Sequence, residues 1–400
     1  MRPRWRWSLI AVAAVAQLLI GLLVLPQQAV RVAHRYPPAV PWVSPVDLPQ
    51  PSPTPDLGSL DEDIGSVLVV SWYGSEMTPE LQSLLVDGRV GGVLLFGSNF
   101  GSSPAGVKAW ADRLQALAST ACLDHPILIM LDEEGGQVAQ VKAGFAPPSE
   151  LVAGAGGADN VRALERANAQ GLRQAGVGLN LAPVADVRTN PYDGVIGDRS
   201  FGSNPQLVPP LVAAAVQGLH DGGVGATLKH FPGLGGAAGD PHVAIPTDPE
   251  SEAHWKQVQL PSFQAGVSAG ADAVMTTAVY VPGLGAGNMP AMFSAAVVGR
   301  LRTQLGFGGV IMTDSLSMGG IGNRWSLPQA AVMALSAGND LALLSNGDTS
   351  YEMDALSAVR AAVGTGQLDR TKLHESALRV NALRDKWGGR FTHCRPPLSA

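Results

Sequence analysis

The segment KHFPGLGGAAGDPH, which runs from Lys229 to His242, places two histidines, a lysine and an aspartate among several glycines. Because glycine adopts backbone angles that other residues avoid, a segment of this composition is a loop that can move. His242 follows Asp240 by two residues, and an imidazole that titrates at roughly pH 6.5 can both give and take a proton. The pair is a candidate acid/base device, although a surface turn with solvated polar residues has the same composition.

Polar residues also follow several short apolar runs elsewhere in the chain. They are Asp132 after PILIML, Asn180 and Asp186 around LAPV, Lys229 and His230 after GATL, and Asp314 after GGVIMT. A single Asp or Asn at such a place is common, because these residues cap helices and form turns. Polar and ionisable residues at the ends of several separate strands indicate instead that the strand ends converge on an active site.

Eight apolar runs supply candidate strands: SVLVVSW, VGGVLLFG, PILIMLD, VGLNLAPV, GATLKHF, ADAVMTT, GGVIMTD and DLALLSN. Each is nearly continuous in apolar residues, which is typical of a parallel strand buried on both faces. Between them lie segments with helical spacing of apolar residues, such as SPAGVKAWADRLQALAST and NVRALERANAQGLRQAG. This alternation predicts an α/β fold, a (β/α)8 TIM barrel. The rival fold, an open doubly wound sheet, lacks its GxGxxG motif after the first strand.

The N-terminus predicts a membrane segment. Three arginines precede an apolar run at residues 8–25, which is long enough to cross a bilayer as a helix. The basic flank predicts that residues 1–7 are cytoplasmic. The residues after Leu25 offer no small-x-small cleavage site, so an uncleaved anchor is favoured over a signal peptide. The rest of the chain is then expected outside the cytoplasm, at the cell membrane, or secreted if the segment is cleaved.

Composition divides the remainder of the chain. Residues 26–57 are rich in proline and predict a semi-rigid linker. A single catalytic domain is expected at residues 58–388, closed by the helical pattern at its end, and an irregular tail at residues 389–400. The two cysteines, Cys122 and Cys394, either form a disulfide or remain thiols.

The overall charge excludes one class of partner. The chain has a formal net charge of -6, and 46% of its residues are hydrophobic while only 15% are charged. A nucleic-acid-binding protein needs a basic face, so no nucleic-acid partner is expected. The composition fits a compact fold with a large core.

Five motifs carry a resemblance to a known family. LDEEGGQVAQV, LNLAPVADV, IGDRSFG, KHFPGLGGAAGDPH and IMTDSLSMGGI occur in this order between about Ser66 and Gly388. Together they resemble glycoside hydrolase family 3, and in particular its single-domain bacterial β-N-acetylhexosaminidases, which trim peptidoglycan sugars. The resemblance implies a hydrolase that acts on O-glycosyl bonds without a cofactor or metal.

The resemblance also implies residue roles. Asp314 matches the family's nucleophile, which forms a covalent glycosyl-enzyme intermediate in a retaining mechanism. His242, assisted by Asp240, matches the general acid/base of this subgroup. Such an aspartate orients the imidazole ring and favours its charged form.

Four further residues match the family's sugar-binding positions: Asp132, Arg199, Lys229 and His230. A carboxylate accepts hydrogen bonds from sugar hydroxyls, while Arg and Lys donate to hydroxyls or to an acetamide carbonyl. The same residues could instead form a structural ion-pair cluster at the mouth of a barrel.

The chain departs from the family pattern near the expected pocket. Gln137 and Gln140 stand where the family has arginines, and Lys142 is a candidate replacement without the fork geometry of Arg. Leu234 and Ala278 stand where histidines are usual. These changes bear on which sugar is preferred and on how tightly it binds, and not on the nucleophile or on the acid/base pair.

The sequence therefore predicts an anchored, retaining exo-β-N-acetylglucosaminidase that acts on muropeptides or related small carbohydrates. One alternative is another exo-β-glycosidase, such as a β-glucosidase, although these usually carry a second α/β domain. The other is a catalytically degenerate sugar-binding protein of the envelope, for which an intact nucleophile and acid/base pair would have no use. Phosphate in place of water as the acceptor also remains open.

Overall fold

Eight short parallel strands form the centre of the computed structural model, which describes residues 57–142, 144–192, 195–389 and 391. They are β1 (Leu68–Val70), β2 (Gly92–Leu94), β3 (Leu128–Leu131), β6 (Leu179–Asn180), β7 (Gly225–Phe231), β8 (Ala273–Thr276), β9 (Val310–Thr313) and β10 (Ala342–Leu343). Their order in the sheet is β10-β1-β2-β3-β6-β7-β8-β9, and an isolated parallel bridge between Met312 and Leu341 nearly closes it. All eight predicted runs form these strands, so the predicted α/β barrel is confirmed.

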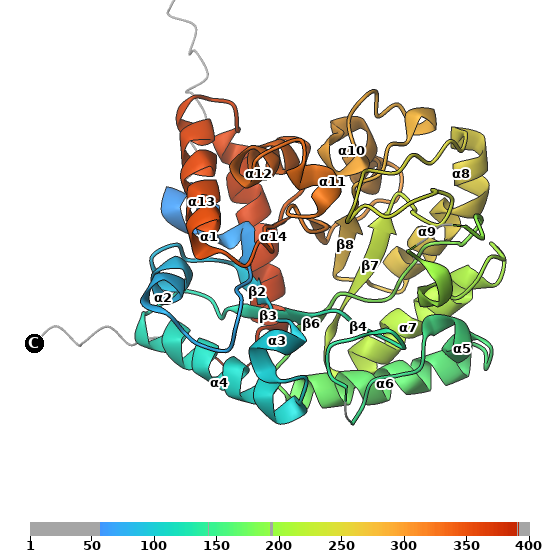
Figure 1. Ribbon diagram of the computed structural model, residues 1–400, viewed down its shortest axis with the longest axis horizontal. Helices are drawn as coiled ribbons and strands as arrows, with labels where there is room; N and C mark the ends of the chain where they lie inside the picture. Colours follow the sequence, from blue (N-terminus) through green and yellow to red (C-terminus); the bar gives the residue numbers. More distant parts are fainter. Residues whose placement is uncertain (1–56, 143, 193–194, 390, 392–400) are drawn as a thin grey trace, which may run out of the picture. The chain divides into compact units, whose positions relative to one another are not determined.

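Helices surround these strands (Figure 1). The helices are α1 (Leu60–Ser66), α2 (Pro79–Val86), α3 (Gly97–Phe100), α4 (Pro104–Thr120), α5 (Glu150–Gly154), α6 (Ala158–Gln174), α7 (Val208–Gly222), α8 (Glu252–Val258), α9 (Leu260–Ser268), α10 (Ala295–Thr303), α11 (Gly319–Gly322), α12 (Leu327–Ser336), α13 (Thr349–Gly364) and α14 (Arg370–Trp387). Three single-turn 3-10 helices lie at η1 (Gly197–Arg199), η2 (Pro282–Leu284) and η3 (Ala291–Phe293). A small antiparallel hairpin, β4 (Glu133–Gly135) and β5 (Val138–Ala139), follows β3 directly.

Local sequence explains where the long helices begin. The Ser103 hydroxyl caps α4 by accepting the Gly106 N–H at 3.1 Å, and Pro104 follows at the first helical position, where no backbone donor is needed. Because of the helical repeat, the apolar residues lie on one face of α4, which is buried: Val107, Trp110, Ala111, Leu114 and Ala118. The predicted helical run 103–120 is therefore confirmed as α4.

Strand side chains alternate between two apolar cores, because successive residues of a strand point to opposite faces. Val69, Leu94 and Met130 belong to a cluster inside the barrel, whereas Leu68 and Val93 pack outward against the helices. Burial on both faces explains why the strand sequences are continuous in apolar residues.

The C-terminal helical pattern forms two helices, α13 and α14. Val380 and Leu383 of α14 belong to the cluster inside the barrel, and Trp387 packs against it. A Cβ built on Gly178 or Gly225, just before β6 and at the start of β7, would lie within 3 Å of Trp387. Helix α14 therefore closes the amino end of the barrel and leaves the carboxyl ends of the strands open.

The predicted membrane segment at residues 8–25 and nearly all of the linker at 26–57 lie outside the described residues, as does Cys394, one of the two cysteines. Within the described part of the chain, none of the helices has the length and hydropathy that a membrane crossing requires.

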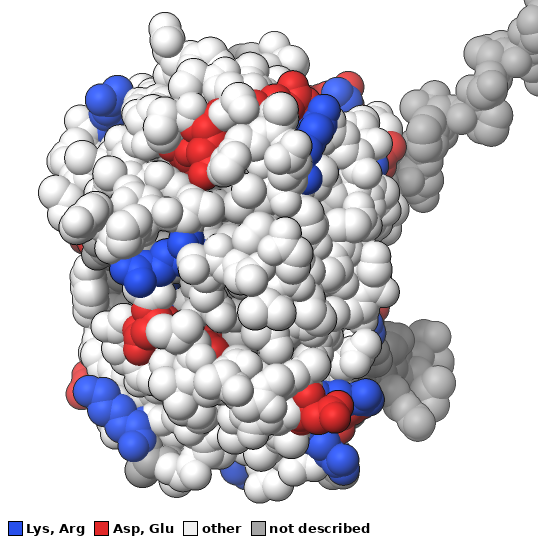
Figure 2. Space-filling view, turned by 90° about the vertical axis from the view of Figure 1, so that its right-hand side faces the viewer, with Lys and Arg blue, Asp and Glu red and all other residues white. Residues whose placement is uncertain are grey.

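Charge is spread thinly over the domain. Figure 2 shows one face, on which Lys and Arg side chains lie in small separate groups among Asp and Glu groups and large uncharged areas. A continuous basic surface, which a polyanion would need, is not visible on this face.

Buried carboxyl groups lie around the barrel. Burial raises the pKa of Glu165 in α6 and of Glu352 in α13 to about 8, and that of Glu133 in β4 to about 7. Glu352 accepts the backbone N–H groups of Ser71 at 3.1 Å and Asn346 at 3.3 Å. It thereby joins the segments that follow β1 and β10.

We expect the free energy of unfolding to fall as the pH rises from 4.5 to about 8. Between the ordinary carboxyl pKa and each folded-state pKa, about 7 for Glu133 and about 8 for Glu165 and Glu352, the unfolded chain releases the proton while the folded chain keeps it, so stability falls as the pH rises. Glu165→Gln keeps the shape without the titrating group, so urea unfolding of this variant should depend less on pH. Glu375→Gln, at an exposed position on α14, serves as the control. An unchanged pH dependence in Glu165→Gln would contradict the expectation.

Candidate active site

A cavity of about 490 Å³ opens at the carboxyl ends of the strands. Its apolar floor includes Leu94 of β2, Met275 of β8 and Leu343 of β10. Six of the seven predicted site residues line it: Asp132, Arg199, Lys229, His230, His242 and Asp314. The seventh, Asp240, lines a more open hollow of about 680 Å³ that shares Arg199 and His242 with the first. The barrel therefore brings the predicted residues together, in the place that the fold predicts.

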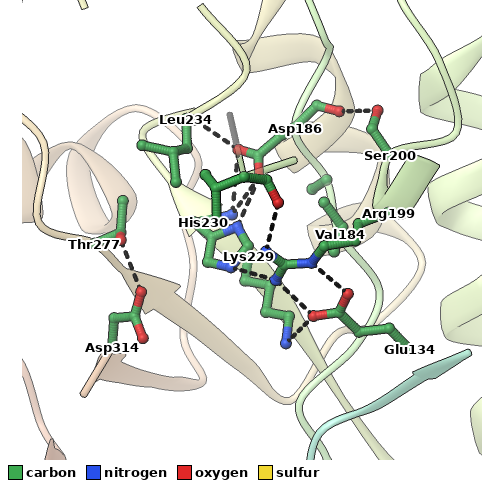
Figure 3. A network of polar contacts seen from close by, with 12 residues as sticks. Glu134, Val184, Asp186, Arg199, Ser200, Lys229, His230, Leu234, Thr277 and Asp314 are labelled. Carbon is green, nitrogen blue, oxygen red and sulfur yellow. Dashed lines mark hydrogen bonds and ion pairs between the residues drawn. The ribbon is translucent and has the colours of Figure 1, made fainter. Parts of the chain in front are cut away.

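Asp314 follows the last residue of β9. One oxygen of its carboxylate accepts the Thr277 hydroxyl at 2.8 Å, and the other accepts the backbone N–H of Ser315 at 2.8 Å. Its own N–H donates to the Thr276 carbonyl of the neighbouring strand β8 at 2.7 Å. Figure 3 shows Asp314 and Thr277 apart from the larger polar network of the site. Donors on both oxygens hold the carboxylate in one orientation toward the cavity.

That larger network is centred on Glu134, a residue that sequence analysis did not single out. The Arg199 guanidinium donates to both of its oxygens at 2.7 Å, and Lys229 Nζ lies 2.6 Å from Oε1 (Figure 3). Burial opposes ionisation of Glu134, but the positive charges of Lys229 and Arg199 outweigh it and hold the pKa at about 2. Glu134 therefore neutralises two cations in the wall of the cavity.

Lys229 is almost fully buried yet charged. Burial lowers its pKa, but the negative charges of Asp132 and Glu134 reverse the direction, and the net pKa is raised. Its Nζ donates to Asp132 Oδ1 at 2.6 Å, while the Asp132 side chain keeps 24% of its surface exposed. A partly exposed carboxylate beside an ammonium group can accept hydrogen bonds from the hydroxyls of a bound sugar.

His230 lies between the carboxylate of Asp186 and the guanidinium of Arg199. Its Nδ1 lies 2.7 Å from Asp186 Oδ2, and its Nε2 lies 3.2 Å from Nη2 of Arg199. Because a guanidinium can only donate, Nε2 accepts, and Nδ1 carries the proton that is donated to Asp186. Asp186 also accepts the Leu234 N–H at 2.7 Å. Asp186 was predicted near the strand ends without a role. Its contacts orient His230 and the start of the glycine-rich loop.

The predicted acid/base pair forms a contact of its own on that loop. His242 Nδ1 and its backbone N–H both reach Asp240 Oδ1, at 2.7 Å and 2.8 Å. The imidazole side chain is 64% exposed. Since Nδ1 faces the carboxylate, Nε2 is the ring nitrogen available to a ligand in the cavity, where it can give or take a proton.

The departures from the family pattern have different consequences. Gln140 lines the cavity, and its Oε1 accepts the Gly97 N–H at 2.9 Å. Gln137 donates to Asp198 beside Arg199 at 2.9 Å. Leu234 is part of the cavity wall, whereas Ala278 is fully buried outside it. The suggested replacement by Lys142 is wrong, because this residue is exposed and is not among those that line the cavity.

Among the described residues, no three His, Cys, Asp or Glu side chains converge in a way that could hold a metal ion.

Comparisons with known proteins agree with this architecture. The family model of the glycosyl hydrolase family 3 N terminal domain matches residues 59–383. "Beta-hexosaminidase LpqI" from Mycobacterium tuberculosis is 33% identical over 364 residues, covering 87% of this chain and 89% of its own.

Solved structures agree as well. The β-N-acetylhexosaminidase from Beutenbergia cavernae superposes with a TM-score of 0.75 at 30% identity, over 82% of this chain and 98% of that one. A glycoside hydrolase family 3 β-N-acetylglucosaminidase from Paenibacillus gives a TM-score of 0.79 at 34% identity, over 82% of this chain but only 62% of that longer one. The chain therefore belongs to glycoside hydrolase family 3 and is a glycoside hydrolase acting on O-glycosyl bonds.

Proposed function

We propose that the protein is a retaining exo-β-N-acetylglucosaminidase that removes terminal β-linked N-acetylhexosamine from muropeptides or related glycans. The observation that carries the proposal is that one cavity is lined both by the fixed carboxylate of Asp314 and by the imidazole of the Asp240–His242 pair. A binding protein would need neither a nucleophile nor a proton donor in that arrangement. The names of the two relatives with solved structures, from Paenibacillus and Beutenbergia cavernae, support an N-acetylated sugar.

In the first step, an Asp314 carboxylate oxygen attacks the anomeric carbon of the terminal sugar. The bond from that carbon to the glycosidic oxygen breaks, and the leaving oxygen takes the proton from His242 Nε2. The products are a glycosyl ester of Asp314 and a free alcohol. Asp240, bonded to Nδ1, orients the ring so that Nε2 faces the leaving oxygen.

In the second step, water attacks the same carbon and gives a proton back to His242 Nε2. The ester bond breaks and the Asp314 carboxylate is restored. Each step inverts the anomeric configuration, so the released sugar keeps the β configuration. Thr277 and the Ser315 N–H stabilise the returning negative charge on the carboxylate.

The substrate sugar would lie in the 490 Å³ cavity, whose size suits one monosaccharide unit and hence exo action. Four polar side chains of the cavity would bind the hydroxyls of this sugar through charge-assisted hydrogen bonds: Asp132, Arg199, Lys229 and His230. The leaving group would extend into the 680 Å³ hollow, which includes the acid/base pair but not Asp314. That hollow gives the leaving group room beside the acid/base pair. An anchored domain outside the cytoplasm would meet such glycans directly.

We expect the full-length chain to hydrolyse para-nitrophenyl N-acetyl-β-glucosaminide at least about tenfold faster, in kcat/KM, than the matching β-glucoside. Proton NMR of the reaction in phosphate-free buffer should show the β anomer of N-acetylglucosamine first. A disaccharide muropeptide should release N-acetylglucosamine. Preference for the glucoside would move the substrate to the other exo-β-glycosidases, and a requirement for phosphate would identify a phosphorylase. A folded chain that turns over none of these substrates would contradict the proposal.

A further inference from the structure

The loop that carries the acid/base pair rests on the segment that carries Asp314. The Gly319 N–H donates to the carbonyl oxygen of His242, and the Gly320 N–H donates to that of Pro241, both at 3.0 Å. These two glycines are the first residues of α11, shortly after Asp314 in sequence. The backbone of His242 itself is therefore bonded to the segment that follows the predicted nucleophile.

Only glycine allows this approach. A Cβ built on Gly319 would stand 2.4 Å from the His242 carbonyl oxygen. One built on Gly320 would stand 2.7 Å from the Pro241 oxygen and 2.8 Å from the Ile245 nitrogen. Neither glycine has a positive φ, so their backbone angles suit any residue. The reason for glycine here is close contact with the loop, and any side chain would move the loop outward.

The loop is also fixed internally and at its other end. Asp240 accepts the backbone N–H groups of Val243 and Ala244 through its carbonyl oxygen, both at 3.0 Å, and that of His242 through its side chain. Near the start of the loop, the Asn190 N–H donates to the Gly235 carbonyl at 2.9 Å. The Asp240–His242 pair is therefore held as one unit, and the contact with Gly319 and Gly320 is its backbone link to the segment that follows Asp314.

We propose that Gly319 and Gly320 are positioning residues that set the place of His242 relative to Asp314, so that proton donor and nucleophile reach the same glycosidic bond. The inference rests on the proposed function. A displacement of about 1 Å in a catalytic group can lower the rate by about 100-fold, and general acid catalysis contributes that much or more. The glycine pair therefore acts on proton donation, and not on attack by Asp314.

The test compares two aryl N-acetyl-β-glucosaminides in the full-length chain. A phenyl leaving group needs a proton, whereas a dinitrophenyl group departs without one. In Gly320→Ala, kcat/KM should fall by about 100-fold for the phenyl substrate and by less than about threefold for the dinitrophenyl substrate. Gly320 is buried and is not among the residues that line the cavity, so the substitution does not alter the sugar site directly. The control is Gly322→Ala, whose Cβ would meet only Ser317 O at 3.8 Å.

A second measurement does not depend on activity. Hydrogen exchange of the peptide that contains Gly319 and Gly320 should be slow in the wild type and faster in Gly320→Ala, because the two amide donors lose their acceptors. If Gly320→Ala does not fold, Gly319→Ala is measured in the same way; because Gly319 lines the cavity, the ratio of its losses on the two substrates, which share the same sugar, is then the readout. Equal losses on both substrates, or no loss on either, would overturn the inference while the proposed function stands. The wild type could instead show slow exchange that is lost in Gly320→Ala, but no glycosidase activity. That result would support the contact between the two glycines and the loop, and it would reject the proposed function.

Discussion

Replacing Asp314 by asparagine is expected to lower kcat/KM for para-nitrophenyl N-acetyl-β-glucosaminide on the order of 10⁴-fold, with little change in stability. The amide keeps the size of the side chain and can still accept the Thr277 hydroxyl, but it cannot form the glycosyl ester. The measurement is initial-rate kinetics together with the urea midpoint of each variant. Asp354→Asn, at an exposed position on α13, is the matched control and should behave like the wild type.

A chemical rescue tests the same role directly. Asp314→Gly leaves room beside the anomeric carbon, where added azide can displace the leaving group in one step. One displacement inverts the configuration, so the product should be the α-glycosyl azide. Activity of Asp314→Asn near the wild-type level, or rescue that yields the β-azide, would show that another residue is the nucleophile.

Glu134→Gln is expected to have the largest effect on stability, a loss of about 3 to 5 kcal/mol in the free energy of unfolding. The Glu134 side chain is buried and ionised. The substitution replaces its carboxylate by a neutral amide, so the buried positive charges of Lys229 and Arg199 lose the anion that they share. Because the folded-state pKa of about 2 lies below the ordinary value of 4.5, this stability is present above pH 4.5 and is lost as the pH falls through 2. Urea unfolding at pH 7 measures the loss, and KM should rise because both cations shift.

Glu252→Gln is an informative comparison. Glu252 also contacts two cations, Arg300 at 2.7 Å and Lys256 at 3.0 Å, but it lies at the surface, where ion pairs contribute little. Its replacement should leave both unfolding and KM nearly unchanged. If Glu134→Gln were no more harmful than Glu252→Gln, the buried network would not support the sugar site as we describe.

The barrel could be predicted from sequence because parallel strands buried on both faces leave a strong signal. Each of the eight apolar runs became a strand, and polar residues at their carboxyl ends, such as Asp132 and Asp314, meet at one cavity. The hairpin of β4 and β5 was not predicted, since strands of three and two residues carry too few side chains to show alternation. Its importance is that it holds Glu134 beside Arg199.

Roles that depend on distant partners could not be read from the sequence. Glu134 stood in the quoted motif LDEEGG, but its ionisation depends on Arg199 and Lys229, which only the closed barrel brings to it. Asp186 likewise needed the position of His230 to gain a role. In contrast, Asp240 and His242 are two residues apart, so their contact followed from local sequence.

The membrane anchor at residues 8–25 and the linker stay predictions, and the two alternatives for Cys122 and Cys394, a disulfide or two thiols, both stay open, because the anchor, nearly all of the linker and Cys394 lie outside the described residues.

The way the barrel closes has a consequence for how the chain folds during synthesis. Its first strand, β1, pairs with its last, β10, and α14 completes the apolar interior only after both have formed. The ribosome must therefore release nearly the whole domain before the enclosing contacts exist, and pairings between such distant segments form slowly. Until then the emerging chain has exposed apolar strands and no enclosed core. Such a delay would suit a polypeptide that has to be threaded through a translocation pore before it folds, and it would make a chaperone that covers these strands useful on the way.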